Sequence, residues 1–385
     1  MKKPSPVAQS LLLTALAFAY FAAFYDLGLN AVMHTYYLGG LSFVQGLDPY
    51  QITLLNGPSN QFKYSPLFAV IMAELATGDQ LMVASLWILA GIAAFSFGLS
   101  RWSDLIGKMP VYAAFSCVAA LIDLTVSMAS YQANALIIGF ILLGLAEHRD
   151  GRFFTAGAIL MLATNIKIYP VVFLLAAGLR FRSEYWMGAL CAGIMAFALP
   201  AFVTSWDHNL EMHLSWFRVI VHDSVGSGVL DLVSAFQRLG LDSLGRVLRV
   251  IVLAVSVPLF FSYSAIEKRT DWRPWMTFGI ASLLLLSPRT EVYTYVLLAP
   301  SYLLMVHWCA ESGDKKVQTF GSFLCAVLAV AIASCRYIDP IWYQSESALE
   351  IVRVLGALGF WILTGGIVGT ALLDSLRIRK TATVG

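Results

Sequence analysis

The stretch QANALIIGFILLGLAEHRDGRFFTAGAILMLATNIKIYPVVFLLAAGLRFR, residues 132–182, decides the fold class. It contains three apolar runs, 132–147, 153–166 and 168–181, and the break after the first run is rich in charge, Glu147-His-Arg-Asp-Gly-Arg152. A transmembrane helix needs about 20 mostly apolar residues, and Lys and Arg gather in cytoplasmic loops. We therefore interpret the runs as membrane spans and the break as a cytoplasmic loop.

The same alternation extends over the whole chain. Of the 385 residues, 59% are hydrophobic and 12% are charged, and the mean hydropathy is +0.74. Soluble domains carry about 25% charged residues, so the solvent of this chain must be lipid. We predict an all-α, polytopic integral membrane protein that forms one domain, residues 1–385. About twelve transmembrane helices are expected, at 7–26, 80–100, 110–130, 132–147, 153–166, 168–181, 185–204, 246–266, 274–287, 293–310, 317–335 and 351–374.

The positions of the basic residues predict the topology. Residues 7–26 follow Lys2 and Lys3 as a signal peptide would, but the run is long enough to span, and no Ala-x-Ala site precedes a soluble domain. We expect both termini to be cytoplasmic in a plasma (inner) membrane, with outer loops at 27–79 and 205–245. The apolar segment 64–77 would rise only about 21 Å against a core of about 30 Å, so it should be an interfacial or re-entrant helix. The basic clusters placed inside are Lys2/Lys3, Arg101/Lys108, 147–152, Arg180/Arg182, 268–273, Lys315/Lys316 and 377–380.

Several function classes are disfavoured. A net charge of +2, scattered between apolar runs, does not suit nucleic acid. The five cysteines stand singly, without the paired spacing of a zinc site. Loop 205–245 lacks metal-ligand spacing such as His-Glu-x-x-His, although it holds several acidic residues and histidines. We expect no metal and no cofactor; the loop's candidates are Asp207, His208, Glu211, His213, His222 and Asp223.

Ionisable residues at membrane depth are costly, so each is a candidate functional group. Lys167 falls at an expected outer turn, whereas positive charge is normally biased to the cytoplasmic side. It either snorkels to the surface or binds an anion, and we favour a phosphate. Asp26 follows the first helix at the outer boundary, where it either caps an interfacial helix or serves the site.

Two further polar groups lie on the same expected face. Gln132 and Asn134 begin a helix there, and they either cap it, bond between helices or serve the site. Arg289 either grips a phosphate bidentately or pairs with Glu291. Asp123, inside the third expected helix, should be protonated or paired with a helix neighbour and is not assigned to the site.

Read in order, these motifs resemble the bacterial polyprenol-phosphate-mannose-dependent alpha-mannosyltransferases, a branch of the GT-C membrane glycosyltransferases. That family shows an Asp after its first helix, a Tyr-Tyr helix ending in Gly-x-Asp-Pro-Tyr, a Tyr-Pro-Pro-Leu-like element, a Gly-Gln-x-Asn turn, a Lys-x-x-Pro turn and a later Ser-Pro element before a Tyr. The matching residues here are Asp26, Tyr36-Tyr37, Gly46-Leu-Asp-Pro-Tyr50, Phe62-Lys-Tyr-Ser-Pro-Leu67, Tyr131-Gln-Ala-Asn134, Lys167-Ile-Tyr-Pro170 and Ser287-Pro-Arg-Thr-Glu-Val-Tyr-Thr-Tyr295.

The resemblance implies a GT-C-like fold with interfacial helices in the first outer loop. It also implies transfer of a sugar, mannose above all, from a polyprenol-phosphate donor to a lipid or glycan hydroxyl on the outer face, with inversion and without metal. Asp26 would be the base. The family's Asp stands about four residues before the Tyr pair, whereas Asp26 stands ten before Tyr36, so Asp48 and Glu291 remain alternatives.

The resemblance implies further roles at the donor site. Lys167, with Arg289 or Lys63, would stabilise the departing phosphate, Gln132 and Asn134 would hold sugar hydroxyls, and Tyr64 would stack on the ring. A transporter or flippase for a lipid-linked sugar is the alternative. Transporters more often show broken helices in two related halves, and no such symmetry is visible. A non-catalytic scaffold would leave the polar residues on this face without purpose.

Overall fold

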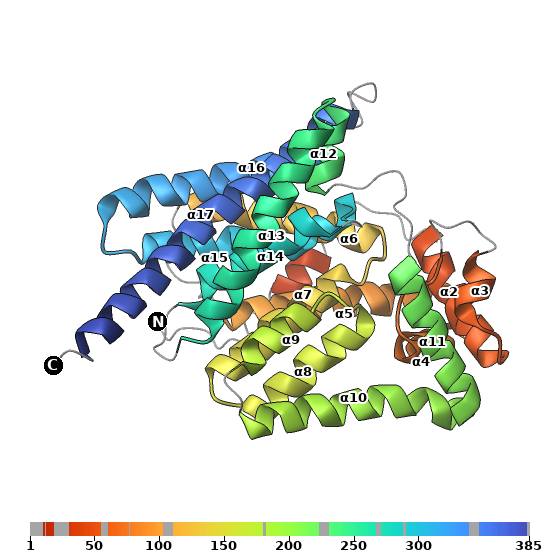
Figure 1. Ribbon diagram of the computed structural model, residues 1–385. Coiled ribbons are helices and arrows are strands. Elements are labelled where there is room, and N and C mark those ends of the chain that lie inside the picture. Colours follow the sequence, from red (N-terminus) through yellow and green to blue (C-terminus); the bar gives the residue numbers. More distant parts are fainter. Residues whose placement is uncertain are drawn as a thin grey trace. The chain divides into compact units, whose positions relative to one another are not determined.

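The computed structural model describes residues 11, 13–18, 31–54, 61–76, 78–102, 111–179, 182–222, 231–266, 271–287, 290–338 and 346–382. Within these ranges the chain is helical and contains no β-strand, which confirms the all-α class (Figure 1). The helices are α2 (Ala31–Val44), α3 (Pro49–Leu54), α4 (Pro66–Ala76), α5 (Gln80–Ser100), α6 (Val111–Ala129), α7 (Asn134–Arg149), α8 (Phe153–Ile166), α9 (Val171–Gly178), α10 (Ser183–Val203), α11 (Trp206–His222), α12 (Leu232–Arg238), α13 (Asp242–Ser264), α14 (Trp272–Leu286), the 3-10 helix η2 (Val292–Leu297), α15 (Ala299–Ala310), the π-helix η3 (Val317–Gly321), α16 (Ser322–Ile338) and α17 (Glu346–Ala382).

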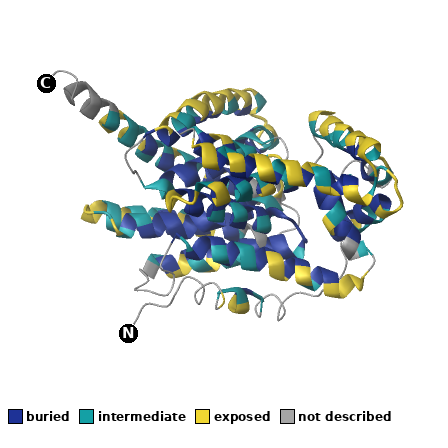
Figure 2. Ribbon diagram, turned by 90° about the horizontal axis from the view of Figure 1, so that it is seen from below, coloured by how far each residue is buried: buried dark blue, intermediate teal, exposed yellow. Residues whose placement is uncertain are grey.

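The chain divides into two compact units. The first unit comprises Met1–Arg101 and Thr125–Gly226, and the second comprises Trp102–Leu124 and Ser227–Gly385. Helix α6 contributes residues to both units. In each unit, buried residues lie where helices face one another, and exposed residues lie on outward faces (Figure 2).

Six helices in the described part of the chain are long and apolar enough to cross a membrane. This makes the chain a membrane protein, but the expected number of twelve spans is not confirmed. The predicted span 168–181 contains only the eight-residue helix α9, and 293–310 divides into η2 and α15. The six candidate spans are Gln80–Ser100, Tyr112–Ala129, Ser183–Val203, Asp242–Ser264, Val317–Ser334 and Ile351–Ser375.

The two segments expected to form outer loops contain helices. Segment 27–79 holds α2, α3 and α4, and the 11 residues of α4 rise only about 16 Å, too little to span alone. Segment 205–245 holds α11, α12 and the start of α13. An apolar stripe runs along α11 and remains exposed, as suits a helix lying in a membrane interface. Its residues are Trp206, Leu210, Leu214, Phe217 and Val221.

Small residues allow the helices of the first unit to approach closely. Helices α5, α7, α8 and α10 pack in succession (Figure 1). A Cβ on Gly157 of α8 would meet the Tyr185 carbonyl oxygen of α10 at 2.0 Å, and one on Gly188 would meet the Phe154 carbonyl oxygen at 1.9 Å. Backbone thus packs on backbone, as is common between membrane helices.

Gly157→Ala should therefore destabilise the first unit. The added methyl group would strike main chain, and overpacking typically costs about 1–3 kcal/mol. Gly193→Ala on α10 is the matched control, because its Cβ would meet only side-chain atoms of Met161 at 3.6 Å or more. Thermal unfolding of the purified chain in detergent should show a lower midpoint for Gly157→Ala alone. If Gly157→Ala and Gly193→Ala unfold at the same temperature, α8 and α10 accommodate the added methyl group without a loss of stability.

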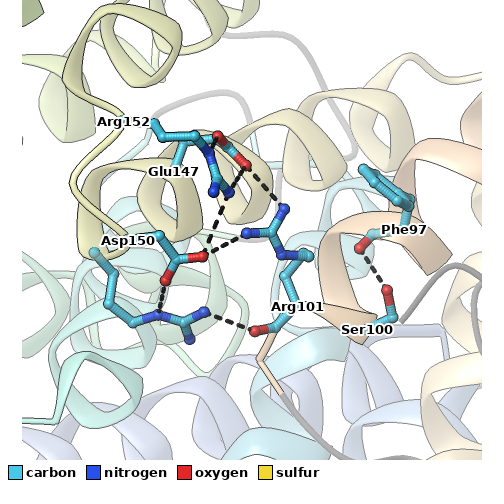
Figure 3. Close-up of polar contacts among 7 residues, drawn as sticks. Phe97, Ser100, Arg101, Glu147, Asp150 and Arg152 are labelled. Atoms are coloured by element: carbon cyan, nitrogen blue, oxygen red, sulfur yellow. Dashed lines mark hydrogen bonds and ion pairs between the residues drawn. The ribbon is translucent and has the colours of Figure 1, made fainter. Parts of the chain in front are cut away.

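A network of ion pairs forms around the end of α7 and the loop between α7 and α8 (Figure 3). Arg101, at the end of α5, lies 2.8 Å from Glu147 and 2.5 Å from Asp150, while Arg149 also pairs with Asp150 and Arg152 with Glu147. Burial would raise the pKa of Asp150, but the hydrogen bonds and charges of Arg149 and Arg101 together lower it. The network joins the end of α5 to this loop.

In the second unit, a buried ion pair joins α6 to α17. Asp123 and Arg353 are each 2% exposed, and Arg353 Nη2 lies 3.7 Å from Asp123 Oδ1. The Tyr302 hydroxyl donates to Asp123 at 2.8 Å, and the Arg353 guanidinium lies 5.6 Å from the Tyr295 ring centroid. From the sequence, Asp123 was expected to be either protonated or paired. The structure pairs it with Arg353 on another helix.

Candidate functional site

Lys167 lies at a polar turn between two apolar helices. Helix α8 ends at Ile166, and the Lys167 backbone turns to an extended conformation, φ −148° and ψ 139°. Pro170 then caps α9. A proline disfavours helical backbone in the residue before it, so the sequence Lys-Ile-Tyr-Pro ends one helix and begins another. The turn places a cation and a phenol between the two helices.

The Lys167 side chain is surrounded by polar and aromatic groups of the first unit. Its Nζ lies 3.4 Å from Asn134 Oδ1, and the Tyr169 hydroxyl donates to the same oxygen at 3.3 Å. The Nζ also lies 5.7 Å from the ring centroid of Tyr64 and 5.9 Å from that of Tyr169, distances that suit cation–π attraction. We call Lys167, Asn134, Tyr64 and Tyr169 the lysine cluster.

Tyr64 is held in place by residues of the helices that precede and follow it. The Tyr36 hydroxyl, from α2, donates to the Tyr64 hydroxyl at 2.7 Å, and the Tyr50 hydroxyl, from α3, donates to the Tyr64 carbonyl at 2.8 Å. Phe68 stacks on the Tyr64 ring with centroids 4.4 Å apart. Burial, and secondly the Asp48 carboxylate, raises the pKa of Tyr50 well above its usual value, so Tyr50 remains a neutral hydrogen-bond donor.

Helix α11 contacts the non-helical segment that carries Lys63. The Trp216 indole donates to the Lys63 carbonyl at 3.2 Å, and α11 packs on α3 and α4. Sequence reasoning missed Trp216, because no local pattern links residues 153 positions apart. Tyr169 was also missed as a site residue, although its place between Lys167 and Pro170 was visible in the sequence.

The turn that presents Asn134 has an unusual backbone. Tyr131 has φ +53°, and it is the only described non-glycine residue with a positive φ. Glycine adopts this conformation most easily, which explains physically why the related pattern has Gly at the position of Tyr131. The Trp87 indole donates to the Tyr131 carbonyl at 2.9 Å, and the Gln132 backbone N–H donates to the Ser127 carbonyl oxygen at 3.1 Å. A non-glycine residue with a positive φ is strained, and backbone strain of this kind is common at functional sites.

The structure brings together three of the predicted donor-site residues, Tyr64, Asn134 and Lys167. Lys63 adjoins Tyr64 in sequence, and Gln132 is a buried member of the turn before Asn134. Tyr64 lies against both Phe68 and Lys167, an arrangement that favours positioning the lysine over stacking on a sugar.

The predicted carboxylates have separate positions. Asp48 begins α3, where its Oδ1 accepts the Tyr50 amide at 2.9 Å. Glu291 belongs to the second unit and begins η2, where its amide donates to the Thr294 hydroxyl at 3.3 Å. Both residues cap the start of a short helix, α3 or η2. Substitution of each carboxylate tests whether it also acts as the base. Asp26 and Arg289 lie outside the described residues.

The described residues contain no group of three His, Cys, Asp or Glu side chains placed to hold a metal ion. Four cysteines in the described ranges, Cys117, Cys191, Cys309 and Cys325, are free thiols.

Comparison with known proteins identifies the family. The sequence pattern of glycosyltransferase family 87 matches residues 62–288, more than half of the chain. The match includes Lys63, Tyr64, Gln132, Asn134 and Lys167. A comparison with curated proteins finds no match. The chain, a membrane protein with a lysine cluster inside the matched region, therefore belongs to glycosyltransferase family 87.

Proposed function

We propose that this glycosyltransferase moves a hexose, mannose in the first instance, from a polyprenol-phosphate donor to a hydroxyl of a lipid or glycan. The reaction takes place at the outer face of the plasma membrane, without metal. The observation that carries the proposal is the lysine cluster, where the Lys167 ammonium lies beside Asn134 within the region matched by the family. The order of the motifs, which resembles that of polyprenol-phosphate-mannose-dependent enzymes, supports this donor.

The lysine cluster suits a lipid-linked phosphate. An ammonium group is a good partner for a phosphate oxygen, and a charge-assisted hydrogen bond is about twice as strong as a neutral one. Asn134 and Gln132 offer amide groups for sugar hydroxyls. Tyr64 acts as a positioning residue, because Tyr36, Tyr50 and Phe68 hold it beside Lys167.

The chemistry needs one base and one cationic site. The acceptor oxygen attacks the anomeric carbon from the face opposite the phosphate, its proton passes to a carboxylate, and the bond between the anomeric carbon and the phosphate oxygen breaks. The electron pair of that bond leaves with polyprenol phosphate, whose developing charge Lys167 stabilises, with Arg289 or Lys63 as the second cation. Asp26 is our proposed base, with Asp48 and Glu291 as alternatives.

In this proposal the whole chain, residues 1–385, serves one transferase. We propose no second activity for any part of the chain.

The proposal is tested in isolated membranes that contain the protein. Radiolabelled polyprenol-phosphate-mannose is added, and the lipids are extracted and separated. A new labelled product that depends on the protein is expected, and at a limiting donor concentration less of it should form with Lys167→Ala. Label that crosses the membrane without forming a product would instead indicate a flippase and contradict the proposal.

A further inference from the structure

A second candidate binding site lies in the second unit, at the groove where η3 and α16 begin. The groove has a volume of about 770 Å³, within the range of about 300–1,000 Å³ typical of small-ligand sites. Its walls come from the ends of α6 and α15, from η3 and α16, and from α17. The lining residues are Tyr112, Trp308, Cys309, Lys315, Lys316, Val317, Thr319, Phe320, Gly321, Phe323, Leu324, Leu363 and Ile367.

The wall of the groove is apolar and open. Phe320 is 66% exposed and Phe323 is 49% exposed, and Tyr112 packs edge-on against Phe323 with ring centroids 5.9 Å apart. Leu363 and Ile367 of α17 add aliphatic surface. An exposed apolar wall of this kind suits a hydrocarbon chain better than a polar solute.

The entrance of the groove is basic. Lys315 and Lys316 are exposed and line the groove, and among the described residues neither forms an ion pair. The nearest carboxylates in sequence have their own partners: Glu311 lies 2.6 Å from Arg273, and Asp314 accepts the Lys316 amide at 2.7 Å. The two ammonium groups are therefore available to an anion.

The backbone at the entrance is also unusual. Residues 317–321 form a π-helix, and π-helical turns frequently occur at functional sites. A Cβ on Gly321 would lie 2.9 Å from the Cys309 sulfur, so glycine lets η3 pack closely on α15. The groove thus combines a basic entrance, an apolar wall and a distorted turn.

We propose that this groove binds an anionic phospholipid. The lipid phosphate lies at Lys315 and Lys316, and an acyl chain lies along Phe320, Phe323 and Leu363. The bias of positive charge toward the inside predicts that the two lysines lie on the cytoplasmic side. Anionic lipids are concentrated there, and basic pockets between membrane helices on that side hold lipid headgroups. This site is separate from the lysine cluster and does not rest on the proposed function.

The test uses the purified full-length chain in nanodiscs of phosphatidylcholine. Phosphatidylglycerol or phosphatidylcholine with a photoactivatable acyl chain is added in equal amount, and crosslinked peptides are identified by mass spectrometry. Phosphatidylglycerol should label peptides of the groove much more strongly than phosphatidylcholine. Lys315→Gln and Lys316→Gln should each reduce this labelling about fivefold, since one lysine near an anionic surface contributes about 1 kcal/mol.

Two further variants separate the groove from general surface charge. Lys2→Gln with Lys3→Gln removes another adjacent lysine pair on the expected cytoplasmic side and should leave groove labelling unchanged. Thr319→Trp narrows the groove without changing its charge and should reduce labelling by both lipids.

Three results would overturn the proposal. The first is equal labelling by the two lipids in the unaltered protein. The second is full labelling by phosphatidylglycerol in Thr319→Trp, which would mean that the lysines bind a headgroup at the surface only. The third is displacement of phosphatidylglycerol by a small amount of polyprenyl phosphate, which would assign the groove to a different lipid.

Discussion

Asp26→Asn should reduce sugar transfer by about 10²–10⁴-fold, the usual contribution of a general base, while the protein remains folded and inserted. Asparagine keeps the size of aspartate and caps helices about equally well. A mere capping role would therefore survive the substitution, whereas proton transfer from the acceptor hydroxyl would not. The rate of product formation from a labelled polyprenol-phosphate sugar measures the effect, with thermal unfolding as the check on folding.

Asp48→Asn and Glu291→Gln are the matched controls. Asp48 caps α3 through the Tyr50 amide, and Glu291 begins η2 in the second unit. Each substitution keeps a side-chain oxygen that can accept a hydrogen bond. Both variants should transfer sugar at rates near those of the unaltered protein. If Asp26→Asn is active and one of these two variants is inactive, the base is that other carboxylate and not Asp26.

Lys167→Ala should weaken donor binding by about 10–100-fold, because a hydrogen bond to a charged group contributes about 1.5–3 kcal/mol. The fold should suffer less, because Lys167 lies at the turn that follows α8 and not inside a helix. The dissociation constant of a labelled polyprenol-phosphate sugar, measured with the purified protein, gives the effect directly.

Lys167→Arg separates charge from shape at this position. Arginine keeps the positive charge and binds phosphate well, so this variant should recover a large part of the affinity lost in Lys167→Ala. If the Lys167→Ala protein unfolds at a lower temperature than the unaltered protein yet binds donor normally, the role of the lysine is structural.

Hydropathy predicted the long helices well but not the short ones. The expected span 80–100 coincides with α5, and 185–204 differs from α10 by a residue or two at either end. The run 168–181 is not confirmed as a span, because it contains only α9, and an apolar stretch of this length suits a short buried helix as well as a span. The run 293–310 is not confirmed as one continuous helix: η2 precedes α15, and Pro300 sits in the first turn of α15, where proline favours a helix start.

The polar turn of the site could be predicted in part. Asn134 and Lys167 stand out in the sequence because they are polar residues at the ends of apolar runs. Their partner Tyr64 comes from the segment between α3 and α4, and Trp216 holds that segment from α11. These contacts depend on tertiary packing, which periodicity does not report. The positive φ of Tyr131 was equally hidden, because tyrosine gives no sign of it.

The choice of donor is tested most directly with the purified protein in liposomes that contain a lipid acceptor. One sample receives mannose-labelled polyprenol-phosphate-mannose, and a parallel sample receives the same label as guanosine-diphosphate mannose. We expect labelled acceptor to form from the polyprenol-linked donor only, and we expect Asp26→Asn to abolish it. Transfer from the nucleotide sugar, without any from polyprenol-phosphate-mannose, would show that the enzyme uses a nucleotide-sugar donor instead.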